Sequence, residues 1–313
     1  MSQPAFAGVD WGTTRFRAWL LAADGEVLAE RRADDGLLAT ERDRFGDVLE
    51  GHLAAMGADA ALPVLACGMV GSRQGWVEVP YVDVPAKLTD VAAKAVRVPG
   101  TKRDIRIMPG MAQRDPSQPD VMRGEETQLA GVAGLHGGDT LVCMPGTHCK
   151  WVELRDGSVS RFTTWLTGEL YSLLAARSIL RHSIGTAGAT VEAGDSMFAK
   201  WLDDGLAHPG DATSRLFRIR ASTLLFDLKP AEAAAALSGL LIGSEVASAK
   251  AHFDAAGRTV TLVVSGKIGA LYVEALQRAG LKATLIDAER TVRLGLMEAA
   301  RTVFGTAGGG AKS

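Results

Sequence analysis

The sequence is poor in cysteine, and its three cysteines are too few and too irregularly spaced for a disulfide framework or a paired set of metal ligands. Cys67 and Cys143 lie in apolar, strand-like runs and are predicted to be small buried side chains. Cys149 follows a few residues later. This use of cysteine is typical of a protein from a reduced compartment.

The chain also lacks an excess of charge of one sign, and it lacks long apolar runs. Its formal net charge is −2 at pH 7, which argues against nucleic-acid binding through a broad basic surface. No apolar run approaches the roughly 20 residues that span a bilayer, and the first residues carry no basic segment, apolar stretch or cleavage signal for export. We therefore expect a cytoplasmic protein without nucleic-acid or membrane partners.

What is present is the composition of an ordinary globular enzyme. Of the 313 residues, 47% are hydrophobic and 22% are charged, and this length predicts about two domains. The glycine-rich end, 305–313, is predicted to be a flexible tail, because a segment of small and polar residues does not join a packed core.

One pattern occurs twice in the chain. Residues 5–10 form a short apolar strand, a tight turn follows, and a second strand covers 15–22. An Asp-Gly turn, which is a strong hairpin signal, then leads into a third strand. The same succession recurs over 140–162, with strand, Gly-Thr loop, strand, Asp-Gly turn and strand. Two such loops in similar units are expected to face each other across a cleft and to hold a polyphosphate there.

Segments with helical spacing of apolar residues separate and follow the two units. The predicted helices are 43–57, 166–181, 229–252, 269–279 and 288–303, and the predicted buried strands are 259–265 and 281–286. Helices mixed with hairpin strands and buried strands predict an α/β fold with mixed sheets.

The first Gly-Thr loop has the chemistry of a phosphate site. Asp10 ends the first strand, and Gly12, Thr13 and Thr14 can present backbone N–H groups and two hydroxyls to phosphate oxygens. An aspartate at this place can hold Mg²⁺ directly or through water. A plain hairpin turn with hydroxyl caps has the same residues, but the second Gly-Thr loop, at 146–147, favours the phosphate interpretation.

These two loops resemble the phosphate motifs of a known superfamily. Asp10-x-Gly12-Thr13-Thr14-x-x-Arg17-Ala18 is similar to the first phosphate motif of sugar and polyol kinases in the actin–hexokinase superfamily, and Pro145-Gly146-Thr147-His148 resembles the second. The resemblance implies a two-lobed actin-like ATPase fold, built from duplicated ribonuclease H-like domains with a cleft between the lobes. It also implies ATP as phosphate donor and Mg²⁺ as the metal.

The same resemblance assigns roles to individual residues of the loops. It places Arg17 near the transferred phosphate, with Arg15 as a second candidate on the same strand face. It makes Gly146, Thr147 and His148 part of the phosphate site. His148 is expected to form a hydrogen bond in the loop rather than to bind a metal, because no second ligand stands at a suitable spacing.

An acidic helix start precedes the second loop. The segment 123–131 resembles the helix starts of glycerol-kinase-like enzymes and exopolyphosphatases, and this resemblance makes Glu125 the base or water-positioning residue. A carboxylate at a helix N-terminus stays ionised beside free N–H groups and can orient the proton of an attacking hydroxyl. A solvated helix cap is the alternative role, and Glu126, one position off the motif, is the alternative base.

The nucleotide-binding end of the site matches the superfamily less well. Where the superfamily has a Gly-Gly pair after a strand, this chain has Gly266 followed by Lys267. Gly266 is predicted to let the backbone approach the nucleotide, while Lys267 either contacts a phosphate or faces solvent. Thr164, Thr167 and Glu169 can line the cleft, although the last two also fit a helix start.

The loop 67–76 carries side chains suited to a sugar acid. Arg73 can bind a carboxylate, Gln74 can bind hydroxyls, and Trp76 can stack on a sugar face. Ser72 is included in this predicted substrate site. The alternative is a surface turn whose tryptophan caps the core. An arginine that binds a carboxylate favours an acid sugar over a neutral one.

Four segments together closely resemble the 2-dehydro-3-deoxygalactonokinase family, along essentially the whole chain. They are 68–76, 122–128, 145–152 and 166–170. The resemblance implies ATP-dependent phosphorylation of the C6 hydroxyl of 2-dehydro-3-deoxy-D-galactonate to the 6-phosphate, in galactonate catabolism. The residues alone indicate only a small, polar, anionic substrate.

Other functions on the same fold stay open, because a fold does not determine function. They are a kinase for another sugar acid such as 2-dehydro-3-deoxygluconate, a polyphosphate or nucleotide phosphohydrolase, and a regulatory protein without catalysis. The predicted domains are 1–122, with the first loop and the sugar-acid site and completed by helix 288–304, and 123–287, with the second loop and the adenosine site. A small-molecule sugar acid is the expected partner, and a homodimer is the candidate assembly.

Overall fold

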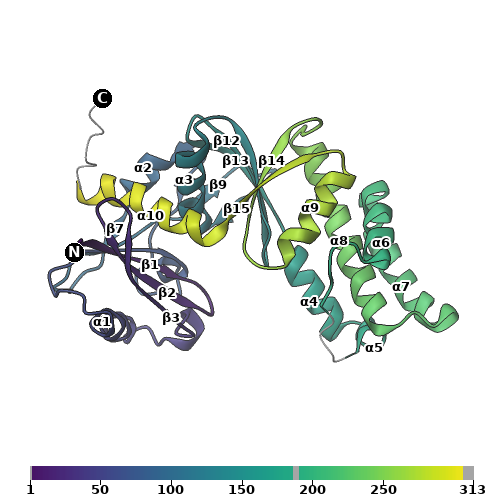
Figure 1. The fold of residues 1–313 in the computed structure, drawn as a ribbon, viewed down its shortest axis with the longest axis horizontal. Helices are drawn as coiled ribbons and strands as arrows, with labels where there is room; N and C mark the ends of the chain where they lie inside the picture. The colour runs from purple at the N-terminus through teal and green to yellow at the C-terminus, as the bar shows by residue number, and fades with distance from the viewer. Residues whose placement is uncertain (1, 186–189, 306–313) are drawn as a thin grey trace. The chain divides into compact units, whose positions relative to one another are not determined.

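The computed structural model describes residues 2–185 and 190–305 and divides the chain into two compact units. Among the described residues, unit 1 contains 2–139, 154–161 and 288–305, and unit 2 contains 140–153, 162–185 and 190–287. The sequence predicts a domain boundary between residues 122 and 123. In the structure, residues 123–139 and 154–161 also belong to unit 1. The predicted tail beyond residue 305 lies outside the described residues. Figure 1 shows the course of the chain.

Unit 1 is built on a mixed sheet with the strand order β3-β2-β1-β4-β8-β7. Its strands are β1 (Pro4–Trp11), β2 (Phe16–Ala22), β3 (Val27–Ala33), β4 (Val64–Gly68), β7 (Val96–Arg97) and β8 (Ile105–Ile107). The β1–β2 and β2–β3 pairs are antiparallel hairpins, while β4 runs parallel to both β1 and β8. The aromatic and aliphatic face of α1 (Phe45–Ala55) packs into the core of this sheet through Phe45, Leu49 and Leu53.

Shorter elements complete unit 1. A three-stranded sheet has the order β10-β9-β5. The bounds are β5 (Val82–Asp83), β6 (Ala86–Lys87), β9 (Met111–Gln113), β10 (Asp120–Met122), α2 (Leu88–Ala92), α3 (Glu125–His136), α10 (Ala288–Phe304), and the 3-10 turns η1 (Leu37–Ala39) and η2 (Met69–Gly71). The sequence patterns do not predict these short strands, since two or three residues are too few to show a periodicity.

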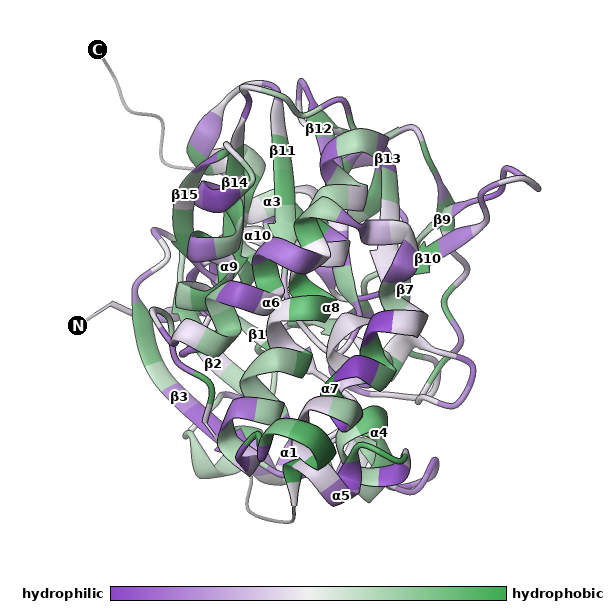
Figure 2. Cartoon of the chain, turned by 90° about the vertical axis from the view of Figure 1, so that its right-hand side faces the viewer, coloured by the Kyte–Doolittle hydropathy of each residue, from purple (hydrophilic) through white to green (hydrophobic). Residues whose placement is uncertain are grey.

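A second sheet, most of which belongs to unit 2, has the order β15-β14-β11-β12-β13, and β13 pairs with β6 through Ser158 and Val159, which belong to unit 1. Its strands are β11 (Thr140–Met144), β12 (Cys149–Arg155), β13 (Ser158–Trp165), β14 (Thr259–Val264) and β15 (Lys282–Asp287). The central strands β11 and β14 are parallel and almost wholly buried, and Figure 2 shows β11 largely in the green of hydrophobic residues. A strand covered on both faces is expected to be apolar along its whole length.

The two sheets repeat one connection pattern. The order β3-β2-β1-β4-β8 in the first corresponds to β13-β12-β11-β14-β15 in the second, and β14 runs parallel to both β11 and β15, as β4 does to β1 and β8. The duplication predicted from the two Gly-Thr loops is therefore confirmed. The tight turns are also where the sequence predicts them, with Gly25 and Gly157 at positive φ.

Helices make up the rest of unit 2. They are α4 (Thr167–Arg177), α5 (Arg181–Ile184), α6 (Ser196–Ala207), α7 (Ala212–Phe226), α8 (Pro230–His252), α9 (Ile268–Arg278) and the 3-10 turn η3 (Pro209–Asp211). Figure 1 shows α4, α5, α6 and α7 gathered around α8. The helix α8 is buried over most of its length. None of the described helices is long and apolar enough to cross a membrane.

Helices α3 and α10 cross within unit 1 with their backbones in direct contact. A Cβ atom at Gly295 would overlap the carbonyl oxygen of Thr127, and a Cβ atom at Gly131 would overlap that of Thr291. Two helices approach this closely only where glycine leaves room for the opposite backbone. The crossing holds α3, whose first residue is Glu125, against the C-terminal helix.

We predict that Gly295→Ala lowers the free energy of unfolding by roughly 3 kcal/mol, because the added methyl group forces the two helix backbones apart. Gly134→Ala is the matched control on α3, since the nearest atom to its Cβ would be Glu298 Cγ at 3.9 Å. There the better helix propensity of alanine should raise stability by up to about 1 kcal/mol. Urea unfolding measures both, and equal stabilities would contradict the close crossing.

Candidate active site

Asp10 lies near the end of β1, opposite Arg17 on β2. The Arg17 Nη2 atom is 3.0 Å from Asp10 Oδ2, and Arg17 Nη1 is 3.7 Å from Glu289 Oε2 at the start of α10. Burial raises the pKa of the Asp10 carboxyl; the Arg17 charge opposes this shift, and the charges of Glu125 and Glu289 add to it. Three carboxylates and one arginine therefore interact at this edge of the sheet.

Two glycines bring the relevant chain segments together. Gly68 ends β4 beside β1, and a Cβ atom there would lie 2.7 Å from the Trp11 carbonyl oxygen and 3.5 Å from Asp10 Oδ1. Gly124, with φ of 106°, precedes α3, and its Cβ would lie 3.3 Å from Gly68 Cα. Both glycines adopt positive φ, which side chains other than glycine rarely tolerate. The ends of β1 and β4 and the start of α3 thus meet in one place.

The structure separates the two candidate bases at the start of α3. Glu126 is 1% exposed, and its carboxylate accepts a hydrogen bond from the Gly124 amide at 2.6 Å and from the Thr127 hydroxyl at 3.2 Å. Glu125 is only partly buried and accepts from the Arg123 amide at 3.1 Å. Glu125 is therefore the glutamate with an accessible carboxylate, and its charge acts on Asp10.

The first Gly-Thr loop is held in place by backbone hydrogen bonds. The Gly12 amide donates to the Arg15 carbonyl at 2.9 Å. The carbonyls of Gly12 and Thr13 accept hydrogen bonds from the backbone amides of Leu37 and Leu38, each at 3.0 Å. The side chains of Thr13 and Thr14 are exposed. Beside the loop, a hollow of about 280 Å³ is lined by three arginines, among other residues. They are Arg15, Arg17 and Arg32.

Of the four predicted substrate residues, one is buried, two are exposed and one is partly buried. Ser72 is 7% exposed, whereas Arg73 and Gln74 are exposed. The Trp76 ring stacks on Phe45 with the centroids 6.1 Å apart and joins the partly buried edge of the core. This packing agrees with the alternative interpretation of Trp76, in which it covers the core and does not bind a sugar.

Two residues of this site were not predicted from sequence. Glu289 forms ion pairs with Arg17 and with Arg32, the latter at 2.6 Å. It follows β15, far from the first loop along the chain, so only the fold brings it there. Arg123 lies between Met122 and Gly124, and its guanidinium lies 4.4 Å from the centroid of the Tyr81 ring.

The second Gly-Thr loop belongs to unit 2 and is held by the start of α4. Gly146, Thr147 and His148 are exposed. The Glu169 amide donates to the Thr147 carbonyl at 2.9 Å, and His148 Nε2 lies 2.6 Å from Glu169 Oε2. A Cβ atom on Gly168 would overlap the Gly146 carbonyl oxygen. His148 is thus a hydrogen-bonding residue of the loop, as the sequence indicates.

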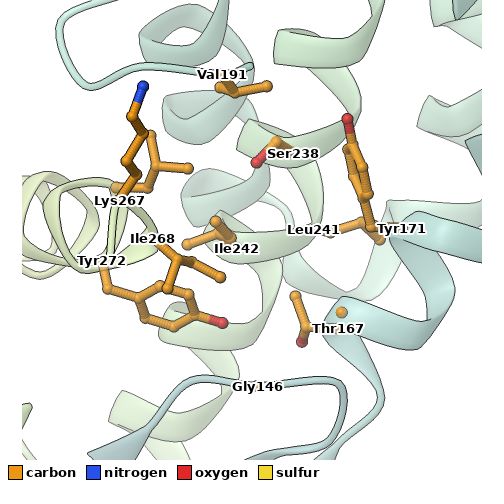
Figure 3. A pocket seen from close by; sticks show the side chains of 12 residues that line it. Gly146, Thr167, Tyr171, Val191, Ser238, Leu241, Ile242, Lys267, Ile268 and Tyr272 are labelled. Carbon is orange, nitrogen blue, oxygen red and sulfur yellow. The ribbon is translucent and has the colours of Figure 1, made fainter. Parts of the chain in front are cut away.

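A pocket of about 260 Å³ opens beside this loop (Figure 3). It is lined mainly by apolar groups of α4, α8 and α9, with Gly146 at one end and Lys267 at the other. Figure 3 shows Tyr171 across the pocket from Ile268 and Tyr272. Lys267 lies 3.5 Å from Glu192, and both side chains are exposed. Gly266, at φ of 77°, is exposed next to Lys267.

A buried carboxylate fixes the wall of this pocket. Glu245 on α8 is 2% exposed and accepts hydrogen bonds from Tyr272 at 2.7 Å and from Trp151 at 2.8 Å, and also from Thr167. The Cys149 thiol donates to it at 2.8 Å. Because buried polar groups must be hydrogen-bonded, this network ties α4, α8, α9 and β12 into one arrangement. Thr167 is therefore a buried member of the network as well as a residue of the helix start.

The duplicated sheets define the class of protein: an actin-like ATPase fold of the kind found in sugar kinases. A solved structure of the activator of the 2-hydroxyisocaproyl-CoA dehydratase from Clostridium difficile shares this fold, with a TM-score of 0.50 at 14% identity over 94% of this chain and 92% of that chain.

Within this class the chain belongs to the 2-keto-3-deoxy-galactonokinase family, whose sequence profile matches residues 10–299. The 2-dehydro-3-deoxygalactonokinase of Escherichia coli (strain K12) is 34% identical over 299 residues, covering 95% of this chain and 98% of the relative. A crystal structure of a Sinorhizobium meliloti protein, provisionally assigned the same activity, is 48% identical with a TM-score of 0.91 and covers 95% of this chain and 98% of that chain. The resemblance recognised in the sequence is confirmed.

The buried Glu126 gives a pH-dependent stability. Burial, and next the charge of Glu125, raise its pKa to about 8 from 4.5. The folded protein therefore keeps a proton that the unfolded chain releases, and stability falls as pH rises from about 4.5 to 8. In Glu126→Gln we expect this fall to be shallower than in the wild type, by up to about 1.4 kcal/mol per pH unit.

Urea unfolding at several pH values between 5 and 8 measures this difference in slope. Glu298→Gln is the matched control, because Glu298 lines the same hollow between α2, α3 and α10 but its side chain is 47% exposed. That variant should keep the wild-type slope. Equal slopes in the wild type and Glu126→Gln would show that Glu126 ionises normally in the folded protein.

Proposed function

We propose that this protein is an ATP-dependent kinase that phosphorylates the C6 hydroxyl of 2-dehydro-3-deoxy-D-galactonate, giving the 6-phosphate, in galactonate catabolism. The observation that carries the proposal is the close grouping of Asp10, Arg17 and Glu125 beside an exposed Gly-Thr loop, in a member of the 2-keto-3-deoxy-galactonokinase family. The substrate is that of the named relative in Escherichia coli. This grouping supports phosphoryl transfer, which relies mainly on positioning and electrostatics.

The carboxylates at the end of β1 suit Mg²⁺. Hard divalent cations prefer carboxylate oxygens, and Asp10 is flanked by the negative charges of Glu125 and Glu289 with one arginine beside them. Asp10 would hold the ion directly or through water, and the ion would neutralise charge on the phosphates. Arg17 would act on the phosphate oxygens, and the partly buried Gly12 with the exposed Thr13 and Thr14 would offer further donors.

Glu125 is the residue proposed to act on the substrate hydroxyl. Its carboxylate is partly exposed at the N-terminus of α3 and accepts a hydrogen bond from the Arg123 amide. It would accept a hydrogen bond from the C6 hydroxyl and hold its oxygen toward the γ-phosphate. The proton passes from the hydroxyl to the Glu125 carboxylate as the O6–Pγ bond forms, while the bond from Pγ to the β,γ-bridging oxygen breaks and ADP leaves. Glu126 is unsuited to this role because its oxygens are turned to the backbone of the first turn.

The pocket of unit 2 is proposed to bind the adenosine group. Its apolar lining and the open backbone at Gly266 suit a flat base and a ribose. The loop of Gly146, Thr147 and His148 borders this pocket and would bind phosphate groups. The structure of the Clostridium difficile activator contains the nucleotide analogue ADPNP, which supports nucleotide binding by this fold.

A coupled assay of ADP release tests the proposal directly. Purified protein with Mg·ATP is offered 2-dehydro-3-deoxygalactonate, 2-dehydro-3-deoxygluconate, neutral sugars, glycerol and polyphosphate. We expect release with 2-dehydro-3-deoxygalactonate and a 6-phosphate as product. Release only with another sugar acid would retain the kinase and replace the substrate, while phosphate release without any acceptor would indicate a phosphohydrolase.

We predict that Glu125→Gln lowers kcat by roughly 10²–10⁴-fold with little change in the KM for ATP, because the amide cannot accept the hydroxyl proton. Glu126→Gln is the comparison, and its kcat should fall far less. Steady-state kinetics with the coupled assay measure both. A larger loss of kcat in Glu126→Gln would assign the base to that residue instead.

A further inference from the structure

Arg123 is a partly buried cation at the centre of the loops that precede α3. Its Nη2 atom donates to the Val79 carbonyl at 2.8 Å, and the guanidinium lies 4.4 Å from the centroid of the Tyr81 ring. On another side, Nη1 would lie 3.0 Å from a Cβ atom on Gly71. The guanidinium therefore touches the turn that leads directly into Ser72 and the predicted substrate loop.

Several donors at this place have no acceptor. The Nε and Nη1 atoms of Arg123 and the hydroxyl of Ser72 are all buried, and among the residues that the structure describes none of them has a hydrogen-bond partner. Ser72 as a whole is 7% exposed. Buried polar groups in folded proteins are nearly always paired, and each unpaired one costs free energy. Such a group of unmatched donors indicates a ligand that accepts from them.

The charge of Arg123 is only partly compensated. Its guanidinium forms no ion pair in the described part of the chain; Glu125 accepts from its backbone amide. Burial raises the pKa of the nearby Glu126 carboxyl, and the charge of Arg123 opposes this shift only as a smaller effect. Arg215 is the useful contrast, because its unpaired Nε belongs to a guanidinium that forms an ion pair with Asp204. A desolvated cation is stable only when an anion compensates it. The missing acceptor is therefore negatively charged.

The position of Arg123 relative to Glu125 suggests which anion this is. The two residues are separated only by Gly124, whose φ of 106° turns the chain sharply between them. The sugar acid has its carboxylate at C1 and its reacting hydroxyl at C6, at opposite ends of one short molecule. Arg73, the arginine favoured by the sequence, is exposed, and an exposed charge gains little from pairing in water.

We propose that Arg123, together with Ser72, binds the C1 carboxylate of the substrate and thereby makes the enzyme select an acid sugar. The proposal rests on the proposed function and adds the residues that determine substrate class. Arg123 supplies charged N–H donors, Ser72 supplies a hydroxyl donor, and the carboxylate accepts from both. The ligand thus provides the counter-charge and the acceptors that the protein itself does not supply.

The test compares the sugar acid with its primary carboxamide, which has the same shape without the charge. The wild type should prefer the acid by roughly 100-fold in kcat/KM, since removing one member of a buried charge pair has an effect of this size. In Arg123→Met, kcat/KM for the acid should fall by roughly 100-fold while that for the carboxamide changes little, so the preference is lost. The KM for ATP should stay near its wild-type value.

Arg73→Met is the matched control and should keep the preference for the acid. Loss of the preference in Arg73→Met with retention in Arg123→Met would overturn the proposal and return the carboxylate to Arg73. If Arg123→Met does not fold, as judged by thermal unfolding, Arg123→Lys and Ser72→Ala decide. Each should lower the preference by roughly 10-fold, and an unchanged preference in both would also overturn the proposal.

The two proposals fail in different ways. If the wild type phosphorylates neither compound, the proposed function is wrong. If the wild type phosphorylates the acid and no Arg123 or Ser72 variant alters the preference, the function stands and the carboxylate site lies elsewhere. Addition of inorganic phosphate distinguishes a general anion site: inhibition that competes with the acid and disappears in Arg123→Lys would replace the carboxylate assignment by nonspecific anion binding.

Discussion

The arrangement of the site depends on one close contact between backbones, that of Gly68 with Gly124. A Cβ atom on Gly124 would lie 3.3 Å from Gly68 Cα, and a Cβ atom on Gly68 would lie 2.7 Å from the Trp11 carbonyl oxygen. Both glycines also hold a φ that other residues avoid. The contact places the start of α3 beside the end of β1, and so it places Glu125 beside Asp10. The crossing of Gly131 and Gly295 farther along α3 fixes the direction of the same helix. Site geometry and helix packing therefore have a common cause in small residues.

The two copies of the duplicated strand–loop–strand unit differ in the polarity of their surroundings: the first is charged and the second is mainly apolar. In unit 1 the Gly-Thr loop follows a strand that ends in Asp10 and is surrounded by arginines and carboxylates. In unit 2 the corresponding loop borders an apolar pocket, and the buried Glu245 is fully occupied by hydrogen bonds from its neighbours. A carboxylate with four donors is a structural group, because its lone pairs are already used. The repeat thus separates a charged half suited to chemistry from an apolar half suited to holding a nucleotide base.

Sequence patterns predict much of the fold and less of the site, for physical reasons. The hairpins, the Asp-Gly turns and the helices near 43–57, 229–252 and 288–303 are local, so their periodicity and turn residues predict them well. The helices α6 and α7 are missed, and α7 buries little more than Arg215 and Ile219. The residues that depend on tertiary structure, Glu289 and Arg123, are not predicted, since no local pattern shows which distant segments will meet. Trp76 is a local feature that the sequence assigns to the substrate site, because a tryptophan can stack on a sugar. In the fold its ring stacks on Phe45 instead.

The charges around Asp10 show why this edge of the sheet is poised for ligands. Burial and the neighbouring carboxylates of Glu125 and Glu289 disfavour the ionised form of Asp10, and Arg17 only partly offsets them. Arg17 itself is shared with Glu289, which also pairs with Arg32. The negative charges of neighbouring carboxylates repel one another. A divalent cation bound among them would remove this repulsion, and the free energy released would favour binding of the ion. Arg123, two residues before Glu125, has a different imbalance, because its Nε and Nη1 donors are buried without an acceptor. A ligand set with a metal ion at one end and a carboxylate at the other would satisfy both imbalances at once.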